Sequence, residues 1–218
     1  VLLSRGKDSQ LPSVGKAEGW VRAARLAQGI DHPLGVAVSD DVVYFTAGGF
    51  ARAKNAIFRV SALGGPVETL ALLDVLPTGD LAVDQEHVYF TSEQGNAVLR
   101  IAKAGGPAAI VTQAQAPTQL ALDQTHVYFV SFARHEPGGS VQRVAKAGGA
   151  AEILASGHIG LDAVVVDERD VYFRSNSGLW RVPKLGGPAQ SLWTRTPTQN
   201  ALRLVADATH LYFVLETP

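Results

Sequence analysis

The sequence contains no cysteine and no methionine. Because cysteine is absent, the protein can form neither a structural disulfide nor a thiolate metal site. Cysteine-free sequences occur in the cytosol and among exported bacterial proteins, so this absence leaves the compartment open. The first residue is Val1 rather than methionine, which is what a processed precursor or a trimmed chain would show, with any signal peptide already removed.

An excess of charge of one sign and long hydrophobic runs are also missing. The formal net charge is -1, the isoelectric point is about 6.6, and no basic run stands out. The electrostatic footprint of a nucleic-acid-binding protein is therefore absent. No segment approaches the roughly 18 uninterrupted apolar residues of a membrane helix. With 46% hydrophobic residues the chain can still form a sizeable core. We expect a globular monomer with no nucleic-acid partner and no insertion into a membrane.

Sequence signatures of catalysis are missing as well. The chain has no G-x-S-x-G nucleophile elbow, no H-E-x-x-H zinc motif, no P-loop and no dinucleotide fingerprint. No residue can therefore be assigned a catalytic role from a motif, and no cofactor is predicted from one.

What the sequence does contain is an internal repeat. An aliphatic residue followed by tyrosine and phenylalanine recurs at intervals of about 40 to 45 residues. This tripeptide stands at Val43–Phe45, Val88–Phe90, Val127–Phe129, Val171–Phe173 and Leu211–Phe213. A glycine pair follows four of the copies, at residues 64–65, 105–106, 148–149 and 186–187. Between the two markers stands an arginine before an aliphatic residue, at Arg59, Arg100, Arg143 and Arg181. Three markers that keep one order in four copies identify a repeated structural unit.

Each repeat is predicted to form four short strands. In the second copy these are residues 81–83, 87–91, 97–102 and 108–112, separated by polar turns. The second strand is apolar on both faces, as expected for a sheet that lies between two neighbouring sheets. A four-stranded unit of about 40 residues is typical of a β-propeller blade.

Counting strands predicts an all-β fold, a five-bladed β-propeller with four antiparallel strands per blade. The single domain covers residues 1–218, with blades near 34–72, 79–112, 118–155, 161–194 and 201–218. The last of these lacks its two outer strands. Residues 11–28 resemble the end of the third repeat, so we expect the N-terminal strands to complete the blade that the C-terminal strands begin. Such closure would leave no open radial edge, which would otherwise favour aggregation.

Residues 88–106, Val-Tyr-Phe-Thr followed after a loop by Ala-Val-Leu-Arg-Ile-Ala-Lys-Ala-Gly-Gly, resemble the repeat of secreted bacterial propellers related to YWTD and TolB-like domains. The resemblance covers almost the whole chain. It departs from that family in having phenylalanine where tryptophan is frequent, and in the blade count, which is usually six there. It implies an extracytoplasmic protein, periplasmic or secreted, and it assigns no catalytic residue.

The repeated polar residues have two interpretations. Asp84, Asp123, Asp167 and Asp207 each precede a repeat tyrosine by five residues, and Ser39 takes this place in the first copy. They could form a ring of carboxylates, but we favour acceptors of backbone hydrogen bonds in the turn between the first two strands. Histidines at 87, 126 and 210 would have to converge to bind a metal ion, which their place away from the axis disfavours. The repeat arginines are expected to pair with neighbouring blades or to extend outward into solvent, and the repeat tyrosines to be largely buried.

A ligand site is expected where residues depart from the repeat. Inter-blade loops and the loops between second and third strands should surround one mouth of the channel, where innermost strands bring several blades together. The polar residues at the starts of these strands, which we take as the candidate site, are Asp80, Gln119, Asp162, Asn200 and Arg203. Two carboxylates there would raise each other's pKa, which Arg203 or a cation would relieve. A merely hydrated mouth remains an alternative.

Two functions follow from this site. The first is a non-enzymatic scaffold that binds a small polar molecule or a protein partner at one polar site. The second is a hydrolase or lyase with a divalent ion such as calcium at the mouth, because the oxygen-bearing side chains of Asp80, Gln119, Asp162 and Asn200 are of the kind that calcium takes.

Overall fold

The computed structural model describes residues 11–17, 20–48, 55–77, 80–132, 138–196, 200–206 and 210–216. Within these ranges, side chains are described except at 11–17, 20–24, 200–203 and 215–216. The described elements are all β-strands, and every pairing between them is antiparallel. The chain divides into two compact units, Val1–Phe90 with Arg100–Ala109, and Thr91–Leu99 with Ile110–Pro218.

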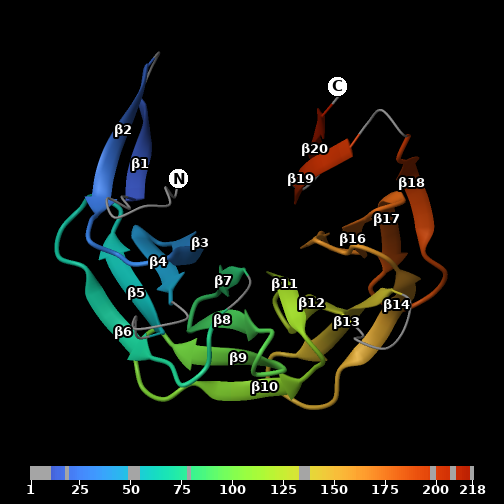
Figure 1. Ribbon diagram of the computed structural model, residues 1–218, viewed down its shortest axis with the longest axis horizontal. Coiled ribbons are helices and arrows are strands. Elements are labelled where there is room, and N and C mark those ends of the chain that lie inside the picture. Colours follow the sequence, from blue (N-terminus) through green and yellow to red (C-terminus); the bar gives the residue numbers. More distant parts are fainter. Residues whose placement is uncertain are drawn as a thin grey trace. The chain divides into compact units, whose positions relative to one another are not determined.

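Unit 1, Val1–Phe90 with Arg100–Ala109, begins with a two-stranded sheet of β1 (Leu11–Ala17) and β2 (Trp20–Ala27). A four-stranded sheet follows, in the order β3-β4-β5-β6. Its strands are β3 (Pro33–Ser39), β4 (Val42–Ala47), β5 (Ala56–Ser61) and β6 (Glu68–Leu72). The next sheet has the order β10-β9-β8-β7, and the boundary between the units runs through it. Its strands are β7 (Leu81–Val83), β8 (His87–Ser92), β9 (Ala97–Ala102) and β10 (Ala109–Gln113). Figure 1 labels these strands.

Unit 2, Thr91–Leu99 with Ile110–Pro218, contains two complete four-stranded sheets and one two-stranded sheet. The first comprises β11 (Pro117–Leu122), β12 (His126–Phe132), β13 (Gly139–Ala145) and β14 (Glu152–His158). The second comprises β15 (Ala163–Val166), β16 (Asp170–Ser175), β17 (Gly178–Pro183) and β18 (Gln190–Thr194). The chain then forms the pair β19 (Asn200–Ala206) and β20 (Leu211–Glu216).

The four strands predicted for the second repeat are confirmed as β7 to β10, within one or two residues at each end. The Tyr-Phe strand is the second of its sheet in every copy, and β4, β8 and β12 are buried on both faces over most of their length. The repeat also keeps one register in three of the sheets. There the repeat tyrosine lies opposite the repeat arginine on the third strand: Tyr44 opposite Arg59, Tyr128 opposite Arg143 and Tyr172 opposite Arg181.

The glycine pairs sit in the turn between the third and fourth strands. Gly64 and Gly65 have φ angles of 90° and 133°, and Gly186 and Gly187 have 90° and 130°. Residues with a Cβ rarely adopt this backbone region, so glycine is required for the tight turn that the sequence predicts here. The repeated glycine pair is therefore explained by the backbone conformation of this turn.

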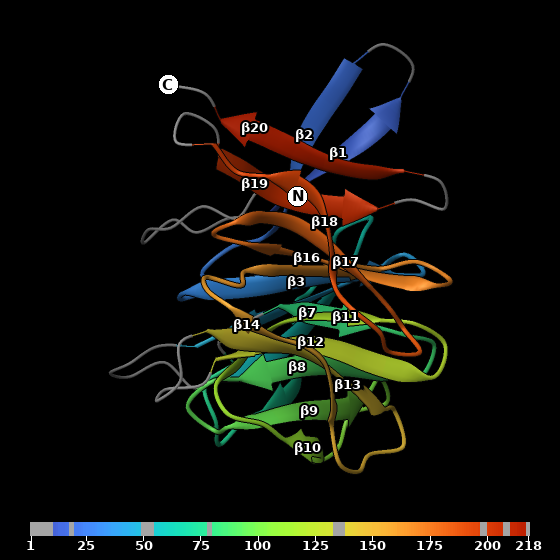
Figure 2. The ribbon, with the colours of Figure 1, turned by 90° about the vertical axis from the view of Figure 1, so that its right-hand side faces the viewer.

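The cores of the units lie between neighbouring sheets. In unit 1, Leu26 and Ala27 of β2 pack with Val43, Phe45 and Val60 of the next sheet. In unit 2, a larger core cluster joins the sheet β11–β14 to the sheet β15–β18, which lie one above the other in Figure 2. Its buried members are Tyr128, Val130, Val141, Ala155, Leu161, Val164, Val171, Phe173 and Val182. A smaller cluster around Leu179 and Leu204 joins β15–β18 to β19–β20. The sheets that these clusters join thus cover one another within each unit, as a two-sided apolar pattern requires.

The burial predicted for the repeat tyrosines is right for three, holds in part for Tyr172 and is wrong for Tyr212. Tyr44, Tyr89 and Tyr128 are buried, with Tyr128 only 1% exposed. Tyr172 is half-buried, and Tyr212 is 50% exposed. Tyr212 differs because it lies on β20, in a sheet of two strands rather than four. The five-bladed count and the completion of β19–β20 by residues 11–28 remain predictions.

Candidate functional site

The two ends of each sheet have different chemistry. At one end lie the turn between the first and second strands and the turn between the third and fourth; we call it the Asp end, since it holds Asp84, Asp123 and Asp167. At the other end lie the turn between the second and third strands and the connection to the next sheet; we call it the connection end. Antiparallel pairing puts these turns at opposite ends of a sheet.

At the Asp end, the repeated aspartates are turn residues. The Asp123 Oδ1 accepts hydrogen bonds of 2.8 Å from the backbone N–H of both Thr125 and His126. Asp167 accepts the same two bonds from Arg169 and Asp170, also at 2.8 Å. This confirms the prediction that these residues accept backbone bonds. Asp207 of the last copy lies outside the described residues.

The second carboxylate oxygen of Asp123 and of Asp167 binds a tyrosine hydroxyl, a contact that we did not predict from the sequence. The Tyr128 hydroxyl donates to Asp123 Oδ2 at 2.7 Å, and the Tyr172 hydroxyl donates to Asp167 Oδ2 at 2.7 Å. The spacing of five residues between aspartate and tyrosine was the signal. It places the hydroxyl of a second-strand tyrosine over the turn that begins the strand.

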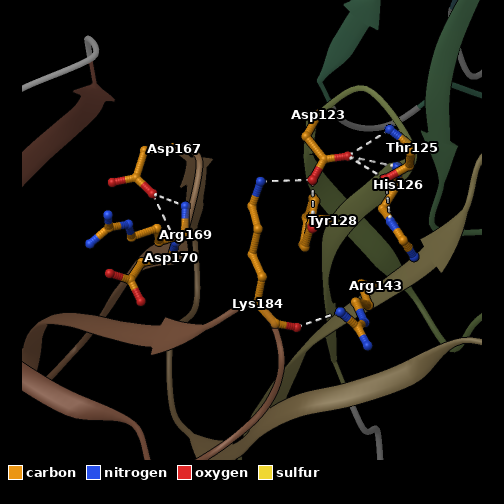
Figure 3. A network of polar contacts seen from close by, with 9 residues as sticks. All are labelled: Asp123, Thr125, His126, Tyr128, Arg143, Asp167, Arg169, Asp170 and Lys184. Atoms are coloured by element: carbon orange, nitrogen blue, oxygen red, sulfur yellow. Dashed lines mark hydrogen bonds and ion pairs between the residues drawn. The ribbon is translucent and has the colours of Figure 1, made fainter.

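A lysine from the following repeat completes this arrangement. The Lys184 ammonium lies 2.7 Å from Asp123 Oδ2 and 5.2 Å from the centre of the Tyr128 ring. The Arg143 guanidinium donates to the Lys184 carbonyl and forms an ion pair of 2.7 Å with Glu152. Figure 3 shows the contact of Lys184 with Asp123 and that of Arg143 with the Lys184 carbonyl, both of which reach from one sheet to the next. We call this set, a lysine bound to the carboxylate and tyrosine of the preceding repeat and an arginine bound to its carbonyl, the lysine clasp.

Unit 1 has a variant of the lysine clasp. The Lys103 ammonium lies 2.9 Å from the Ser39 hydroxyl oxygen, 3.5 Å from the Asp40 carboxylate and 5.7 Å from the centre of the Tyr44 ring. Arg59 donates to the Lys103 carbonyl at 3.0 Å. Serine, which stands where later copies have aspartate, therefore still accepts the lysine. The prediction that the repeat arginines contact the neighbouring repeat is confirmed for Arg59 and Arg143.

The lysine clasp shifts the pKa values of its members. Burial raises the pKa of the Asp123 carboxyl, but hydrogen bonds from Lys184, Tyr128 and the backbone outweigh it and leave the pKa well below its usual range. Burial, together with the Asp123 charge and hydrogen bond, raises the pKa of the Tyr128 hydroxyl far above its usual value. At neutral pH the Asp123 carboxyl therefore stays ionised and the Tyr128 hydroxyl stays protonated. Groups so firmly held in one protonation state are poor acid–base catalysts at neutral pH.

A hollow of about 960 Å³ opens at the Asp end of unit 2. It is lined by Asp123, Gln124, Thr125, Val166, Asp167, Glu168, Arg169, Lys184 and Ala206. Its lining includes both acidic and basic side chains, and the Lys184 ammonium is bound to Asp123 at its wall.

At the connection end, the five candidate residues have different surroundings. Asp80 is exposed just before β7, and Gln119 is half-buried on β11. The Asp162 carboxylate forms an ion pair with Arg174 of the adjacent strand β16. Burial raises the pKa of Asp162, although the Arg174 charge opposes this. The side chains of the other two candidates, Asn200 and Arg203 on β19, lie outside the described residues. The structure thus brings Asp162 together with Arg174 rather than showing a meeting of all five.

Among the described residues, no group of three or more His, Cys, Asp or Glu side chains has an arrangement that could hold a metal ion. In that part of the chain, no helix has the length and apolarity needed to cross a bilayer.

Sequence reasoning missed a second polar feature at the connection end. A hollow of about 580 Å³ is lined by Gln94, Asn96, Gln113, Ala114 and Gln115. Asn96 has a φ of 49°, and its side-chain oxygen accepts a 3.1 Å bond from the Ala116 backbone N–H. The turn is thereby fixed against the connection between β10 and β11. Amide side chains offer donors and acceptors without charge, which suits a neutral polar ligand.

An aromatic group also lies at the connection end of unit 2. The His158 ring makes edge contacts with Phe173 and Trp180, with ring centres 4.8 Å apart in both cases. Burial lowers the pKa of His158, so the ring is neutral at physiological pH. The half-buried His158 therefore has a packing role against these two aromatic side chains.

No family model matches the chain, and no curated protein sequence matches it. Solved structures, in contrast, do match the chain. A structure described as a nidogen/laminin complex has a TM-score of 0.70 and 14% identity, over 97% of this chain and 83% of that chain. An oligogalacturonate lyase in complex with manganese has a TM-score of 0.65 and 13% identity, over 81% of this chain and 56% of that one. Inactive virginiamycin B lyase from Staphylococcus aureus, with quinupristin, has a TM-score of 0.62 and 18% identity, over 97% and 80%.

These similarities, together with the antiparallel four-stranded sheets, show that the chain has a β-propeller fold. A YWTD-type propeller is among the neighbours, in agreement with the resemblance seen in the sequence. The neighbours include both binding proteins and lyases, so the fold alone does not select the activity.

Proposed function

We propose that the protein is a non-enzymatic binding or interaction scaffold with one polar site at the connection end, which would be a mouth of the propeller channel. The observation that carries this proposal is the amide-lined hollow formed by Gln94, Asn96, Gln113 and Gln115. It lies in the type of loop where departures from the repeat predicted a site. Asp80, Gln119, Asp162, Asn200 and Arg203 would extend the polar surface of the same mouth.

The distribution of charged groups supports a scaffold. At the Asp end, the lysine clasp uses Asp123, Tyr128 and Lys184 to join successive repeats, so these residues serve the structure. The loops of the connection end differ between repeats, and variable loops on a rigid support are typical of binding proteins. The nidogen neighbour was solved with a protein partner, laminin, which makes a protein ligand a reasonable candidate beside a small polar molecule.

The five-bladed closure belongs to this proposal. In three of the complete sheets the repeat tyrosine lies opposite the repeat arginine of the third strand. The sequence Ser13-Val14-Gly15-Lys16 occupies the place of Arg143-Val144-Ala145-Lys146. The same register would set Ser13 of β1 opposite Tyr212 of β20, giving the last blade its four strands.

The binding function is tested with two double variants, Asp80→Ala with Asp162→Ala, and Gln94→Ala with Gln113→Ala. A panel of neutral saccharides, amino acids and small carboxylates is first screened by the shift in melting temperature, and each compound found is measured by calorimetry. The proposal predicts that at least one double variant weakens binding about tenfold or more while its own melting temperature stays within a few degrees. Full affinity in both would place the site elsewhere. A control, Gln190→Ala on the outer strand β18, should leave affinity unchanged.

A hydrolase or lyase with a divalent ion such as calcium at the mouth is the second candidate. Two of the similar structures are lyases, and one was solved with manganese. This candidate predicts that metal analysis of the dialysed protein finds about one calcium or manganese ion per chain, and that Asp80→Ala with Asp162→Ala removes it. A metal-free protein whose melting temperature does not respond to millimolar calcium or manganese would reject this candidate.

The extracytoplasmic location implied by the YWTD and TolB-like resemblance is also proposed. Fractionation of cells that express the full-length gene, followed by immunodetection, tests it. Recovery only with the cytoplasmic fraction would contradict it.

A further inference from the structure

Each described lysine clasp holds one lysine residue at two points. The Lys184 ammonium binds Asp123 Oδ2 at 2.7 Å and lies over the Tyr128 ring. The carbonyl of the same lysine accepts a hydrogen bond from Arg143. In unit 1, Lys103 is held at the same two points by its own clasp. A lysine clasp therefore recognises an ammonium group and a carbonyl oxygen that are joined by the carbon chain of lysine.

The fourth repeat, which forms the sheet β15–β18 of unit 2, has the other groups of a lysine clasp in the same geometry. Asp167 Oδ1 accepts two backbone bonds of 2.8 Å, and Asp167 Oδ2 accepts the Tyr172 hydroxyl at 2.7 Å. Arg181 lies opposite Tyr172 on the next strand. It donates to Gln190 nine residues later, just as the arginine of the third repeat donates to its own partner nine residues later. The carboxylate, the ring and the guanidinium are thus arranged as in the third repeat.

Among the described residues, no lysine is bound to these groups. In that part of the chain, Asp167 has no contact with an ammonium group like that of the third repeat, and Arg181 donates to no backbone carbonyl. The Arg181 side chain is 43% exposed, whereas that of Arg143 is 19% exposed. Tyr172 is half-buried, whereas Tyr128 is buried. The arginine and the tyrosine of the fourth repeat are therefore more accessible than their counterparts.

The surroundings of Asp167 suit a ligand with a positive charge. Burial raises the pKa of the Asp167 carboxyl, but hydrogen bonds from the Asp170 N–H, the Tyr172 hydroxyl and the Arg169 N–H outweigh it. The pKa lies below its usual value, so the group is an anion at neutral pH. A carboxylate beside a tyrosine ring attracts an ammonium group through both charge and the ring face. The hollow of about 960 Å³ at the Asp end includes Asp167 in its lining and leaves room for a small molecule.

We propose that Asp167, Tyr172 and Arg181 form a binding site for an ω-amino acid of the length of lysine, with its ammonium on Asp167 and its carboxylate on Arg181. The carbon chain of 6-aminohexanoate is that of lysine from Nζ to the carbonyl carbon, so this compound presents both groups that a lysine clasp holds. A guanidinium binds a carboxylate more strongly than a neutral carbonyl, which favours a free acid. The site lies at the Asp end, and it depends neither on the site proposed at the connection end nor on the five-bladed closure.

The first experiment measures 6-aminohexanoate binding to the unmodified protein by calorimetry. Three analogues each change one feature: hexanoate lacks the ammonium, hexylamine lacks the carboxylate, and 4-aminobutanoate is too short to reach both groups. We expect 6-aminohexanoate to bind and each analogue to bind at least about tenfold more weakly, because a charged hydrogen-bonding group is lost or displaced. No binding at millimolar concentration, or equal affinity for hexanoate or hexylamine, would overturn the proposal.

Variants then test whether the fourth repeat is the site. Asp167→Asn keeps an oxygen for the backbone bonds of the turn but removes the charge, and Arg181→Gln removes the guanidinium. Each should weaken 6-aminohexanoate binding about tenfold or more. The control Glu168→Gln removes the same charge from an exposed neighbour that has no counterpart in the lysine clasp, and affinity should stay within about twofold. Equal losses in Asp167→Asn and Glu168→Gln would reveal unspecific attraction and overturn the site. If a variant folds poorly, the analogue series on the unmodified protein decides.

Two further measurements identify the source of the ammonium group. Nα-acetyl-lysine methylamide presents the ammonium and the carbonyl of a lysine residue within a polypeptide. Tighter binding of this compound than of 6-aminohexanoate would overturn the assignment to a free amino acid in favour of a lysine residue of a partner. Lys16 corresponds by sequence to the lysines of the clasps. Binding of 6-aminohexanoate that appears only in Lys16→Ala would show that the chain's own lysine fills the site, and would also overturn the proposal.

Discussion

The Lys184 ammonium binds the Asp123 carboxylate at 2.7 Å although 61 residues separate the two in the chain. The side chains are only 12% and 20% exposed, so water screens the pair much less than a surface ion pair. Because the pair joins one repeat to the next, its free energy stabilises the packing between sheets rather than a single sheet.

Removal of this lysine should therefore destabilise the protein measurably. We expect Lys184→Met to lower the free energy of unfolding by about 1–3 kcal/mol, because Asp123 loses the cation that compensates its burial. Lys103→Met is the matched control, since its carboxylate partner Asp40 is 89% exposed and lies at 3.5 Å. Urea denaturation should show a smaller loss for Lys103→Met; equal losses would mean that burial of the pair is unimportant.

Two substitutions at Tyr128 distinguish the contribution of its hydroxyl to stability from that of its ring. Tyr128→Phe keeps the packing and removes the bond to Asp123, which should cost about 1–2 kcal/mol. Tyr128→Ala also leaves a cavity beside the buried cluster of unit 2, so the total cost should be about 3–5 kcal/mol. Chemical denaturation measures both. An unchanged stability in Tyr128→Ala would contradict the assignment of the repeat tyrosine to the core.

The tyrosines also predict how stability depends on pH. Burial, and then the interaction with the preceding aspartate, raises the pKa of Tyr89 and Tyr172 to about 12. An unfolded tyrosine titrates near 10, so above this pH the unfolded state binds fewer protons than the folded state. The stabilisation is fully present below about pH 10 and is lost as the pH rises to about 12. Unfolding followed by fluorescence, with tyrosinate absorbance in parallel, should show that these two tyrosines ionise as the protein unfolds. The difference between the unmodified protein and Tyr89→Phe or Tyr172→Phe isolates their absorbance, and its appearance near pH 10 in the folded protein would refute the shift.

Gly178 and Gly186 form a matched pair for the cost of adding a side chain. Both have positive φ angles, 138° and 90°. A Cβ at Gly178 would lie 2.0 Å from the Trp193 carbonyl oxygen, whereas a Cβ at Gly186 meets nothing within 4 Å. Gly186→Ala should cost about 1–2 kcal/mol from backbone strain alone, and Gly178→Ala should cost more, with a melting temperature lower by several further degrees. Equal melting temperatures would show that the backbone near Trp193 moves freely.

The repeat explains why most of the fold was predictable from the sequence. Val-Tyr-Phe, arginine and the glycine pair each mark a strand or turn, and the strands follow from their order. The burial of Tyr212 was predicted from the same equivalence and is wrong, because burial depends on the number of strands that cover a residue. That number is a property of the assembled sheets, and the sequence of one repeat does not contain it.

The candidate site was less predictable for a physical reason. Asp80 and Asp162 were chosen because packing does not require a charge at the start of an innermost strand. The ion pair of Asp162 with Arg174 depends on the register of two neighbouring strands, and the amide hollow around Asn96 depends on a backbone conformation that few non-glycine residues adopt. Neither is encoded by residue spacing. The lysine clasp was visible as a recurring lysine, but its partner lies in another repeat.

The lysine clasp between the third and fourth repeats has two complementary halves, an aspartate with a tyrosine and an arginine in one repeat and a lysine in the next. A repeat that carries both halves can be followed by a copy of itself, because the accepting half of one copy already fits the lysine of the next. Gene duplication of a single segment would have produced a growing array without the need to evolve a new interface at each step. Loss of a whole repeat would still leave a lysine next to an aspartate and a tyrosine at the new junction. Loss of half a repeat would leave one of these groups without its counterpart.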